Sequence, residues 1–466
     1  MRLFFTAFPS ILCIVFSLQA RSQKTVELWL TNADKSALFQ KQKTLPGFHK
    51  GVHDSAFIEV NEKITYQSID GFGFALTGGS AMHIIRMSTE ARSSLLNEIF
   101  GTAKNSIGVS YLRVSIGASD LNESVFSYDD LPAGTSDTSM QHFDLGPDKK
   151  DVIPVLKEII SIYPGIKILA SPWSPPSWMK TNNDTRGGRL KPEYYKAYVK
   201  YFLKYIQGMK AEGITIDAIT VQNEPLHPGN NPSLLMTAPD EAEFIKNYLG
   251  PAFKAANVNT KIILYDHNAD RPDYPIFILN DPQAYKYIDG SGFHLYGGKI
   301  EALSIVHDKF PEKNLYFTEQ MVVDRPHDTG ISMVWPVTHI IVGATRNWCR
   351  NVLLWNLAAD PSFKPFTDRG GCPSCQGAVT IDGDQVTRNT AYYTIAHASK
   401  FVRPGSLRIA SSEADKLPNV AFKTPDGKKV LIVVNGSQQM KKFDIVYKNE
   451  LLTAKLEAGA VGTYIW

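Results

Sequence analysis

Two glutamates, Glu224 and Glu319, each stand at the end of a short apolar run of the sequence. A run rich in Ile, Val and aromatic residues is typical of a buried strand, where a charged residue costs desolvation free energy. Their presence there indicates a chemical role, because two carboxyl groups can protonate a glycosidic oxygen and stabilise an oxocarbenium-like centre. The pair therefore predicts glycoside hydrolysis, with retention of configuration at a carboxyl separation of ~5 Å and inversion at ~6.5–9.5 Å.

The two runs belong to a set of eight apolar runs, most of them followed by a stretch of helical periodicity. Eight strand-helix units predict an α/β protein whose strands close into a (β/α)8 TIM barrel. Site residues of such barrels lie at the C-terminal ends of the strands, and counting puts Glu224 on the fourth strand and Glu319 on the seventh. Thr237, followed by Asp240, is a candidate helix start. The predicted strands are 69–76, 109–116, 166–170, 216–221, 262–265, 288–295, 315–318 and 352–357, and the clearest helices are 88–100, 152–163, 193–212, 240–256 and 332–347.

Polar and aromatic residues also end the other predicted strands. Asn223 is placed to donate to a sugar 2-hydroxyl, Tyr296 to hydrogen-bond one carboxylate, and Arg113 to keep that carboxylate ionised. A lone His or Trp near a strand end is more often a packing residue, so it is the convergence of these residues on one barrel face that supports a site. Flat apolar walls are expected from Trp173, Trp178 and Trp355, and ligands for sugar hydroxyls from Asp120 and His294.

Composition narrows the class of protein and of partner. The chain has 466 residues, 43% of them hydrophobic, which is enough for a large core and more than one domain. Its 49 basic and 46 acidic residues give a net charge of +3 with no basic block along the chain. This pattern predicts neither nucleic acid nor an anionic membrane surface as a partner. The aromatic content of 11% suits a ligand with apolar faces, such as a sugar, and the family resemblance described below implies a β-glucoside or β-glucan oligosaccharide as the partner.

The amino end resembles an export signal. Met1-Arg2 supplies a positive start, the stretch 3–18 is almost wholly apolar, and small and polar residues follow. We expect residues 1–22 to be a signal peptide cleaved near Ala20, and the mature protein to be periplasmic or extracellular. A membrane anchor is the less favoured alternative, because Pro9 interrupts a run that is already short for a bilayer span. No later stretch is long and apolar enough to span one.

Strands without a place in the barrel flank it at both ends. Residues 26–30 and 56–67 precede the first barrel strand, and five β runs follow Pro404-Gly405, two of them joined by the turn 425–428. We expect these strands to pair into one antiparallel β-sandwich side domain. The predicted domains are the signal peptide 1–22, N-terminal sandwich strands 23–68, the catalytic barrel 69–400 and the C-terminal sandwich strands 401–466.

Two cysteines, Cys372 and Cys375, lie close together in a loop. A thioredoxin-like motif would open a helix after a strand, and a zinc site would need a second ligand pair at suitable spacing. The remaining interpretations are a small loop-closing disulfide or two inert thiols.

Seven sequence motifs, in order along the barrel, resemble glycoside hydrolase family 30, the family of glucosylceramidase-like enzymes and related β-glycanases. The resemblance implies a barrel with a β-sandwich side domain built from both termini, and a retaining mechanism with Glu319 as nucleophile and Glu224 as acid/base. It also implies that five further residues surround the first sugar, namely Asp120, Trp173, Asn223, His294 and Trp355. The motifs are Gly71-Phe-Gly-Phe with Leu76-Thr-Gly-Gly-Ser80, Leu112-Arg-Val-Ser-Ile-Gly-Ala-Ser-Asp120, 170–182, Gln222-Asn-Glu-Pro225, Phe293-His-Leu-Tyr296, Phe317-Thr-Glu319 and Leu354-Trp-Asn-Leu357.

The expected substrate is a β-linked glucoside, with β-1,6-glucan and glucosylceramide ranked level and xylan lower. One alternative is a carbohydrate-binding barrel with impaired catalysis. Another is a metal-dependent barrel hydrolase using Asp266, His267 and His294, which is disfavoured because the first strand lacks the paired histidines of such sites. We expect no metal or cofactor. We also expect a bell-shaped pH profile, with a raised pKa for Glu224 and an ionised Glu319.

Overall fold

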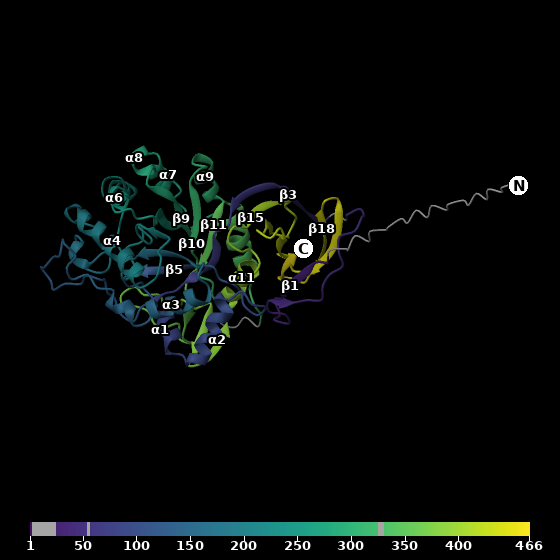
Figure 1. The fold of residues 1–466 in the computed structure, drawn as a ribbon, viewed down its shortest axis with the longest axis horizontal. Coiled ribbons are helices and arrows are strands. Elements are labelled where there is room, and N and C mark those ends of the chain that lie inside the picture. The colour runs from purple at the N-terminus through teal and green to yellow at the C-terminus, as the bar shows by residue number, and fades with distance from the viewer. Residues whose placement is uncertain (2–24, 54–55, 325–329) are drawn as a thin grey trace.

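The computed structural model describes residue 1 and residues 25–53, 56–324 and 330–466. The predicted export signal, Met1 apart, and its cleavage site near Ala20 lie outside the described residues. Two bodies lie side by side, a barrel surrounded by helices and a smaller β domain (Figure 1). In the described ranges no helix combines the length and the apolar character that a membrane crossing requires.

The barrel consists of eight parallel strands that follow one another in chain order, and pairing of the last with the first closes it. The predicted (β/α)8 barrel is therefore confirmed. Apolar side chains from six of the strands, among them Tyr111, Leu169 and Tyr316, pack into one layer inside the barrel. The strands are β4 (Gly71–Ala75), β5 (Tyr111–Ile116), β6 (Lys167–Pro172), β7 (Ala218–Thr220), β8 (Lys261–Ala269), β9 (Ile288–Gly298), β10 (Asn314–Glu319) and β11 (Cys349–Leu354).

Helices follow most of the barrel strands and surround the barrel (Figure 1). The predicted start at Thr237 is confirmed, because Thr237 and Asp240 form a capping box. The α-helices are α1 (Gly78–Arg86), α2 (Thr89–Phe100), α3 (Val152–Ile162), α4 (Tyr195–Ala211), α5 (Ala238–Phe244), α6 (Gly250–Ala255), α7 (Asp273–Leu279), α8 (Pro282–Tyr285), α9 (Ala302–Lys309), α10 (Val334–Pro336) and α11 (Thr390–Ser399). Short 3-10 helices are η1 (Gly146–Lys149), η2 (Ser177–Met179) and η3 (Pro192–Tyr194).

Two of the predicted helices are interrupted by π-helical turns. The segment 240–256 divides into α5, the π-helix η4 (Ile245–Leu249) and α6, and the segment 332–347 consists of α10 followed by the π-helix η5 (Val337–Ala344). A proline lies beside each interruption, at Pro251 and at Pro336. Because proline has no N–H group for an α-helical hydrogen bond, the chain passes through a wider turn at these places.

The side domain is a nine-stranded sheet that combines strands from the N-terminal and the C-terminal parts of the chain. β1 pairs with β20 and β3 pairs with β15, which confirms the predicted pairing of N- and C-terminal strands. β16 and β17 form the predicted hairpin. In spatial order the strands are β19 (Glu450–Leu456), β18 (Lys441–Tyr447), β3 (Phe57–Ser68), β15 (Leu407–Ser411), β16 (Asn419–Lys423), β17 (Lys429–Val434), β20 (Val461–Ile465), β1 (Glu27–Thr31) and β2 (Gln40–Lys41).

This sheet differs from the prediction in two ways. β18 runs parallel to β3, so the sheet is not purely antiparallel, and β19 and β2 were not predicted. Four positions of β19 are buried, and from Leu452 to Leu456 they alternate with exposed polar residues, so β19 forms no continuous apolar run. A further small sheet, also unpredicted, lies beside the barrel and contains β12 (Ala358–Ala359), β13 (Val379–Asp382) and β14 (Gln385–Arg388).

The nine-stranded sheet folds over on itself as a sandwich. Strands β18 and β20 are not neighbours in the sheet, yet the rings of Phe443 and Tyr464 lie 6.2 Å apart between them. One buried apolar cluster draws side chains from eight of the nine strands. His397 of α11 fixes this domain to the barrel, because its two ring nitrogens lie 2.8 Å from the hydroxyls of Thr31 and Thr463. The side domain therefore packs against the helical layer of the barrel.

Candidate active site

The two glutamates meet at the C-terminal end of the barrel. Glu319 is the last residue of β10, the seventh strand, and Glu224 follows β7, the fourth strand. Both line a cavity of about 320 Å³. Five more predicted site residues line the same cavity, namely Asp120, Trp173, Asn223, Tyr296 and Trp355.

Glu319 is buried and is held by one positive charge and one hydroxyl. Arg113 of β5 donates from Nη1 to Glu319 Oε2 at 2.5 Å, and the Tyr296 hydroxyl donates to Oε1 at 3.0 Å. Both contacts agree with the sequence-based prediction. Arg113 also donates from Nη2 to Asn223 Oδ1 at 2.7 Å, which turns the amide NH2 of Asn223 toward the cavity. One buried guanidinium thus orients a carboxylate and a neighbouring amide together.

Glu224 is also buried, and histidines surround its carboxylate. Its Oε1 lies 3.2 Å from His294 Nδ1 and 3.8 Å from His267 Nδ1, and its Oε2 accepts from Asn230 Nδ2 at 3.3 Å. Its backbone has a φ of 45°, a left-handed conformation that is unfavourable for a non-glycine residue. A hydrogen bond of 3.0 Å from its N–H to the carbonyl of Asp266 stabilises that conformation.

Asp266 of β8 connects the surroundings of the two glutamates. Its Oδ2 accepts from Arg113 Nη2 at 2.8 Å and from Thr220 Oγ1 at 2.7 Å, and its Oδ1 lies 3.0 Å from His294 Nε2. From the sequence, Asp266 was noted at a strand end and as a ligand of the disfavoured metal site; in the structure both of its oxygens are instead turned to these partners. Its place at the end of the fifth strand was the only sequence signal.

His294 limits the separation of the two glutamates. Its Nδ1 lies 3.2 Å from Glu224 Oε1 and 3.8 Å from Glu319 Oε1. The two oxygens are therefore no further apart than the sum of these distances, 7.0 Å. This upper limit leaves out most of the range of about 6.5–9.5 Å found in inverting enzymes.

The pKa of Glu224 shifts in the direction opposite to the sequence-based expectation. Burial raises the pKa of the Glu224 carboxyl, but hydrogen bonding and charge from His294, with His267 and His227 nearby, bring it below its ordinary value. Burial is the largest influence on Glu319 and, together with the negative charges of Glu224 and Asp266, raises its pKa above the ordinary value in spite of the positive charges of His294 and Arg113. The expected raised pKa of Glu224 is wrong for the ligand-free protein, because the sequence did not show which carboxylate His294 contacts.

The proton that Glu224 lacks is held on its neighbour. Burial lowers the pKa of His294, but Glu319, Asp266 and Glu224 together raise it to about 9. At neutral pH His294 is therefore an imidazolium whose Nδ1 lies at hydrogen-bond distance from Glu224. Proton transfer between them needs no movement of heavy atoms.

Two tryptophans form the apolar wall of the cavity. The rings of Trp173 and Trp355 stack with centroids 5.4 Å apart, and the guanidinium of Arg113 lies 4.8 Å from the Trp173 ring. The predicted role of Trp178 in this wall is wrong. Trp178 packs in the main core, and its Nε1 donates to the carbonyl of Asp129 at 3.0 Å, because η2 turns its side chain away from the cavity.

The loop after β12 completes the rim. Cys372 and Cys375 form a disulfide, so the interpretation as a loop-closing disulfide is confirmed over two inert thiols. Both cysteines line the cavity, and Cys375 packs with Trp173 and Trp355 in one apolar cluster. Sequence analysis also missed several other lining residues, among them Leu226, His227, Asn230, Asn268 and Met321, which lie in irregular segments or at a strand end without a recognisable motif.

Two buried polar atoms on the cavity wall have no hydrogen-bond partner among the described residues. They are Trp173 Nε1 and His267 Nδ1. Buried polar groups are normally paired, so such atoms in a cavity indicate a polar ligand. A sugar, with apolar faces and hydroxyls at its edge, matches a wall that combines stacked rings with unpaired polar atoms.

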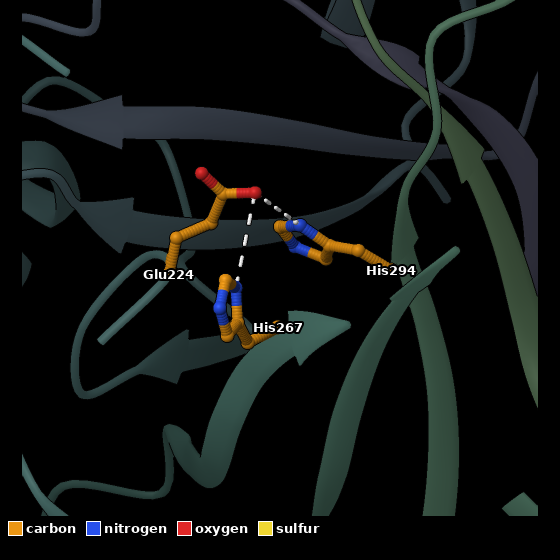
Figure 2. A group of neighbouring side chains, drawn as sticks. All are labelled: Glu224, His267 and His294. Atoms are coloured by element: carbon orange, nitrogen blue, oxygen red, sulfur yellow. Dashed lines mark hydrogen bonds and ion pairs between the residues drawn. The ribbon is translucent and has the colours of Figure 1, made fainter. Parts of the chain in front are cut away.

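The histidines beside Glu224 also form a group that could hold a metal ion. Candidate ligand atoms of Glu224, His267 and His294 all lie within 4.8 Å of one another. Figure 2 shows both imidazoles directed toward the Glu224 carboxylate. Two imidazoles and one carboxylate are a donor set that zinc accepts.

Asp120 gives the site a pH-dependent effect on stability. Burial raises the pKa of its carboxyl to about 8, and the charges of Glu319 and Glu224 act in the same direction. An unfolded Asp ionises near pH 3.9. Between these two pH values the folded protein holds a proton that the unfolded chain has lost, so this group makes the free energy of unfolding fall as pH rises.

We therefore expect the substitution Asp120→Asn to remove this dependence. The difference in free energy of unfolding, variant minus wild type, should increase steadily between about pH 4 and pH 8. Urea unfolding at several pH values measures it, with Asp382→Asn, at an exposed position of β13, as the control. A difference that stays constant across this range would contradict the burial of an uncharged Asp120.

A closed parallel barrel with two buried carboxylates, a stacked tryptophan pair and unpaired polar atoms at the C-terminal ends of its strands has the architecture of a glycoside hydrolase. Comparison with known families agrees. The chain belongs to glycosyl hydrolase family 30: the TIM-barrel domain of that family matches residues 69–402, and its beta sandwich domain matches residues 405–464. The protein is an O-glycosyl hydrolase that acts on β-glycosides.

Its relatives include two kinds of enzyme. The chain is 35% identical over 395 residues to the endo-1,6-beta-D-glucanase neg1 of Aspergillus fumigatus, a match covering 79% of this chain and 78% of the relative. It is 29% identical to the lysosomal acid glucosylceramidase of Mus musculus, over 86% and 81% of the two chains. Among solved structures, the endo-beta1,6-glucanase BT3312 superposes with a TM-score of 0.88 at 34% identity, covering 95% of this chain and 99% of that one.

Proposed function

We propose that the protein is a retaining hydrolase of β-linked glucosides in which Glu319 is the nucleophile and Glu224 the acid/base. The observation that carries this assignment is the difference between their surroundings. Glu319 accepts from the Arg113 guanidinium and the Tyr296 hydroxyl, which fix the direction of its attack. Glu224 instead faces His294, a group that can hold a proton and release it.

These surroundings support a double displacement. In the first step a Glu319 oxygen forms a bond to the anomeric carbon, the glycosidic C–O bond breaks, and a proton passes from Glu224 to the leaving oxygen. In the second step Glu224 takes a proton from water, the water oxygen bonds to the anomeric carbon, and Glu319 leaves as a carboxylate. In the resting enzyme the proton lies on His294, and its transfer to Glu224 supplies the acid of the first step; the proton taken from water in the second step then restores that acid.

The neighbours of the two glutamates would hold the first sugar. The NH2 group of Asn223 is available for the 2-hydroxyl, where a hydrogen bond strengthens in the transition state. Trp173 and Trp355 provide a flat surface, and Trp173 Nε1 an unpaired donor. Asp120, buried and uncharged at neutral pH, can both donate to and accept from a sugar hydroxyl.

We propose β-1,6-glucan as the preferred substrate. Two relatives with 34–35% identity are named endo-1,6-glucanases, whereas the glucosylceramidase is 29% identical. The rim provides a second argument, because beside the tryptophan wall it is formed by a small loop closed by the disulfide of Cys372 and Cys375 rather than by a broad apolar surface for a lipid. We further propose that the protein is exported, on the basis of the positive start and apolar stretch of residues 1–18.

Product analysis tests this function. Purified protein is incubated with β-1,6-glucan, glucosylceramide and xylan, and the anomer formed first is observed by NMR. We expect the highest kcat/KM on β-1,6-glucan and the β-anomer as first product. A first product with the α-configuration would overturn the retaining mechanism, and turnover of glucosylceramide without glucan cleavage would overturn the substrate. Inactivity on a broad β-glycoside panel would favour a binding protein instead.

A further inference from the structure

We propose that Glu224, His267 and His294 form a binding site for a divalent transition-metal ion such as Zn²⁺, and that the bound ion reversibly inhibits the enzyme. The proposal rests on the proposed function in one respect: inhibition follows because Glu224 is the acid/base. The binding site itself depends only on the geometry of the three side chains.

The donor atoms are already close to the spacing that zinc requires. A tetrahedral ion with bonds of about 2.0–2.2 Å needs donor atoms about 3.3–3.6 Å apart. Glu224 Oε1 lies 3.2 Å from His294 Nδ1 and 3.8 Å from His267 Nδ1, and no pair in the group exceeds 4.8 Å. In Figure 2 the two imidazoles approach the same carboxylate oxygen from different sides. Small rotations of the side chains would therefore complete a three-ligand site.

Each histidine has a second feature of a metal ligand. His294 Nε2 lies 3.0 Å from Asp266 Oδ1, which is the carboxylate–histidine arrangement that orients an imidazole behind a metal. His267 is buried, and its Nδ1 has no hydrogen-bond partner among the described residues. An ion would satisfy that unpaired nitrogen.

Access and charge also favour a cation here. Glu224 and His267 line the cavity of about 320 Å³, so the fourth coordination position is open to water. Glu319 and Asp266 add two carboxylates close by, against the guanidinium of Arg113 that both of them contact, and the His294 imidazolium gives up its proton to water when the ion binds. The local charge around a metal at this place is therefore negative.

Occupation by an ion would remove the acid. A metal bound to Glu224 Oε1 holds that carboxylate as an anion, so it can no longer carry the proton for the leaving oxygen. The ion also occupies the space that the glycosidic oxygen must enter. The expected effect is inhibition that competes with substrate and is reversed by a chelator. An inhibitory ion at these histidines differs from the metal-dependent hydrolase considered from the sequence, in which the ion would be required for activity.

The test uses the full-length enzyme after removal of metals by a chelator. Zn²⁺ binding is measured by calorimetry, and Co²⁺ binding by its visible absorption, which reports tetrahedral coordination. Zn²⁺ inhibition is measured with an aryl β-glucoside. The variant His267→Gln removes one ligand and should weaken both binding and inhibition at least about tenfold, as expected when a metal site is impaired.

Two controls separate this site from other zinc ligands. His227→Gln removes a histidine that lines the same cavity but lies outside the group of three. Cys349→Ala removes a buried thiol, the one free cysteine among the described residues. Both variants should keep the wild-type affinity for Zn²⁺.

The outcomes are distinguishable from failure of the proposed function. Unchanged Zn²⁺ affinity in His267→Gln, or binding without inhibition, would overturn the proposal. Activation by Zn²⁺ with loss of activity after chelation would overturn it together with the acid role of Glu224. If the enzyme cleaves no β-glucoside but Co²⁺ binding still depends on His267, the metal site stands and the proposed function fails.

Discussion

Replacement of Glu319 by Gln is expected to lower kcat on every β-glucoside by about 10⁴-fold or more, in line with losses seen when a covalent nucleophile is removed. An amide oxygen is a poor nucleophile for the anomeric carbon, so no covalent glycosyl intermediate can form. Gln has the shape of Glu, and its amide can still accept from Arg113 and contact the Tyr296 hydroxyl. The cavity should therefore remain intact while the chemistry is lost.

Covalent trapping measures this directly. Wild-type protein treated with a 2-deoxy-2-fluoro-glucoside inactivator should gain the mass of one sugar, and peptide mapping should locate it at Glu319. The variant should gain none. Glu312→Gln, an exposed glutamate just before β10, is the matched control and should be labelled like wild type. Labelling of the Glu319→Gln protein at another residue would contradict the assignment of Glu319 as the nucleophile.

The second large effect is expected for Glu224→Ala, and it depends on the leaving group. Loss of a general acid costs about 10²–10⁴-fold, so kcat/KM on glucan should fall by that amount. An aryl glucoside with a strongly acidic phenol needs no protonation and should lose far less in kcat/KM. The kcat of Glu224→Ala on this aryl glucoside should still fall, because no base activates water in the second step. Added azide should restore kcat by attacking the glycosyl intermediate on Glu319.

Glu224→Gln separates acid catalysis from structure. The amide keeps a partner for His294 Nδ1, which alanine does not, yet it cannot donate an acidic proton. Both variants should show the same dependence on the leaving group. Glu193→Ala, at an exposed position of η3, controls for loss of a carboxylate elsewhere. Equal losses of kcat/KM on glucan and on the activated aryl glucoside would contradict the acid role.

The barrel could be predicted from the sequence because its signal repeats. Eight apolar runs placed Glu224 and Glu319 on the fourth and seventh strands, and the structure has both there. Interruptions of helices were harder to foresee. The effect of Pro251 depends on whether surrounding packing tolerates a π turn, which periodicity does not show. Parallel pairing of β18 with β3 is similarly a matter of long-range register.

The sequence predicted which residues belong to the site better than it predicted which hydrogen bonds and ion pairs they make. Arg113 and Tyr296 were expected beside a carboxylate, and both contact Glu319. Asp266 was misread because its role comes from partners on three other strands. The direction of the pKa shift of Glu224 was misjudged for the same reason. Electrostatics depends on distances of a few ångströms that a linear sequence does not contain.

Strands that pair in the side domain are synthesised far apart in time. β1 pairs along its whole length with β20, so Leu28 lies opposite Tyr464. During synthesis β1 and β3 emerge first. β2 can pair with one edge of β1 early, but the other edge of β1 waits for β20, and the edges of β3 wait for β15 and β18. A fragment of residues 405–464 alone would lack both strands. A chain that stops short of β20 therefore leaves one edge of β1 unpaired, as a target for proteases and chaperones.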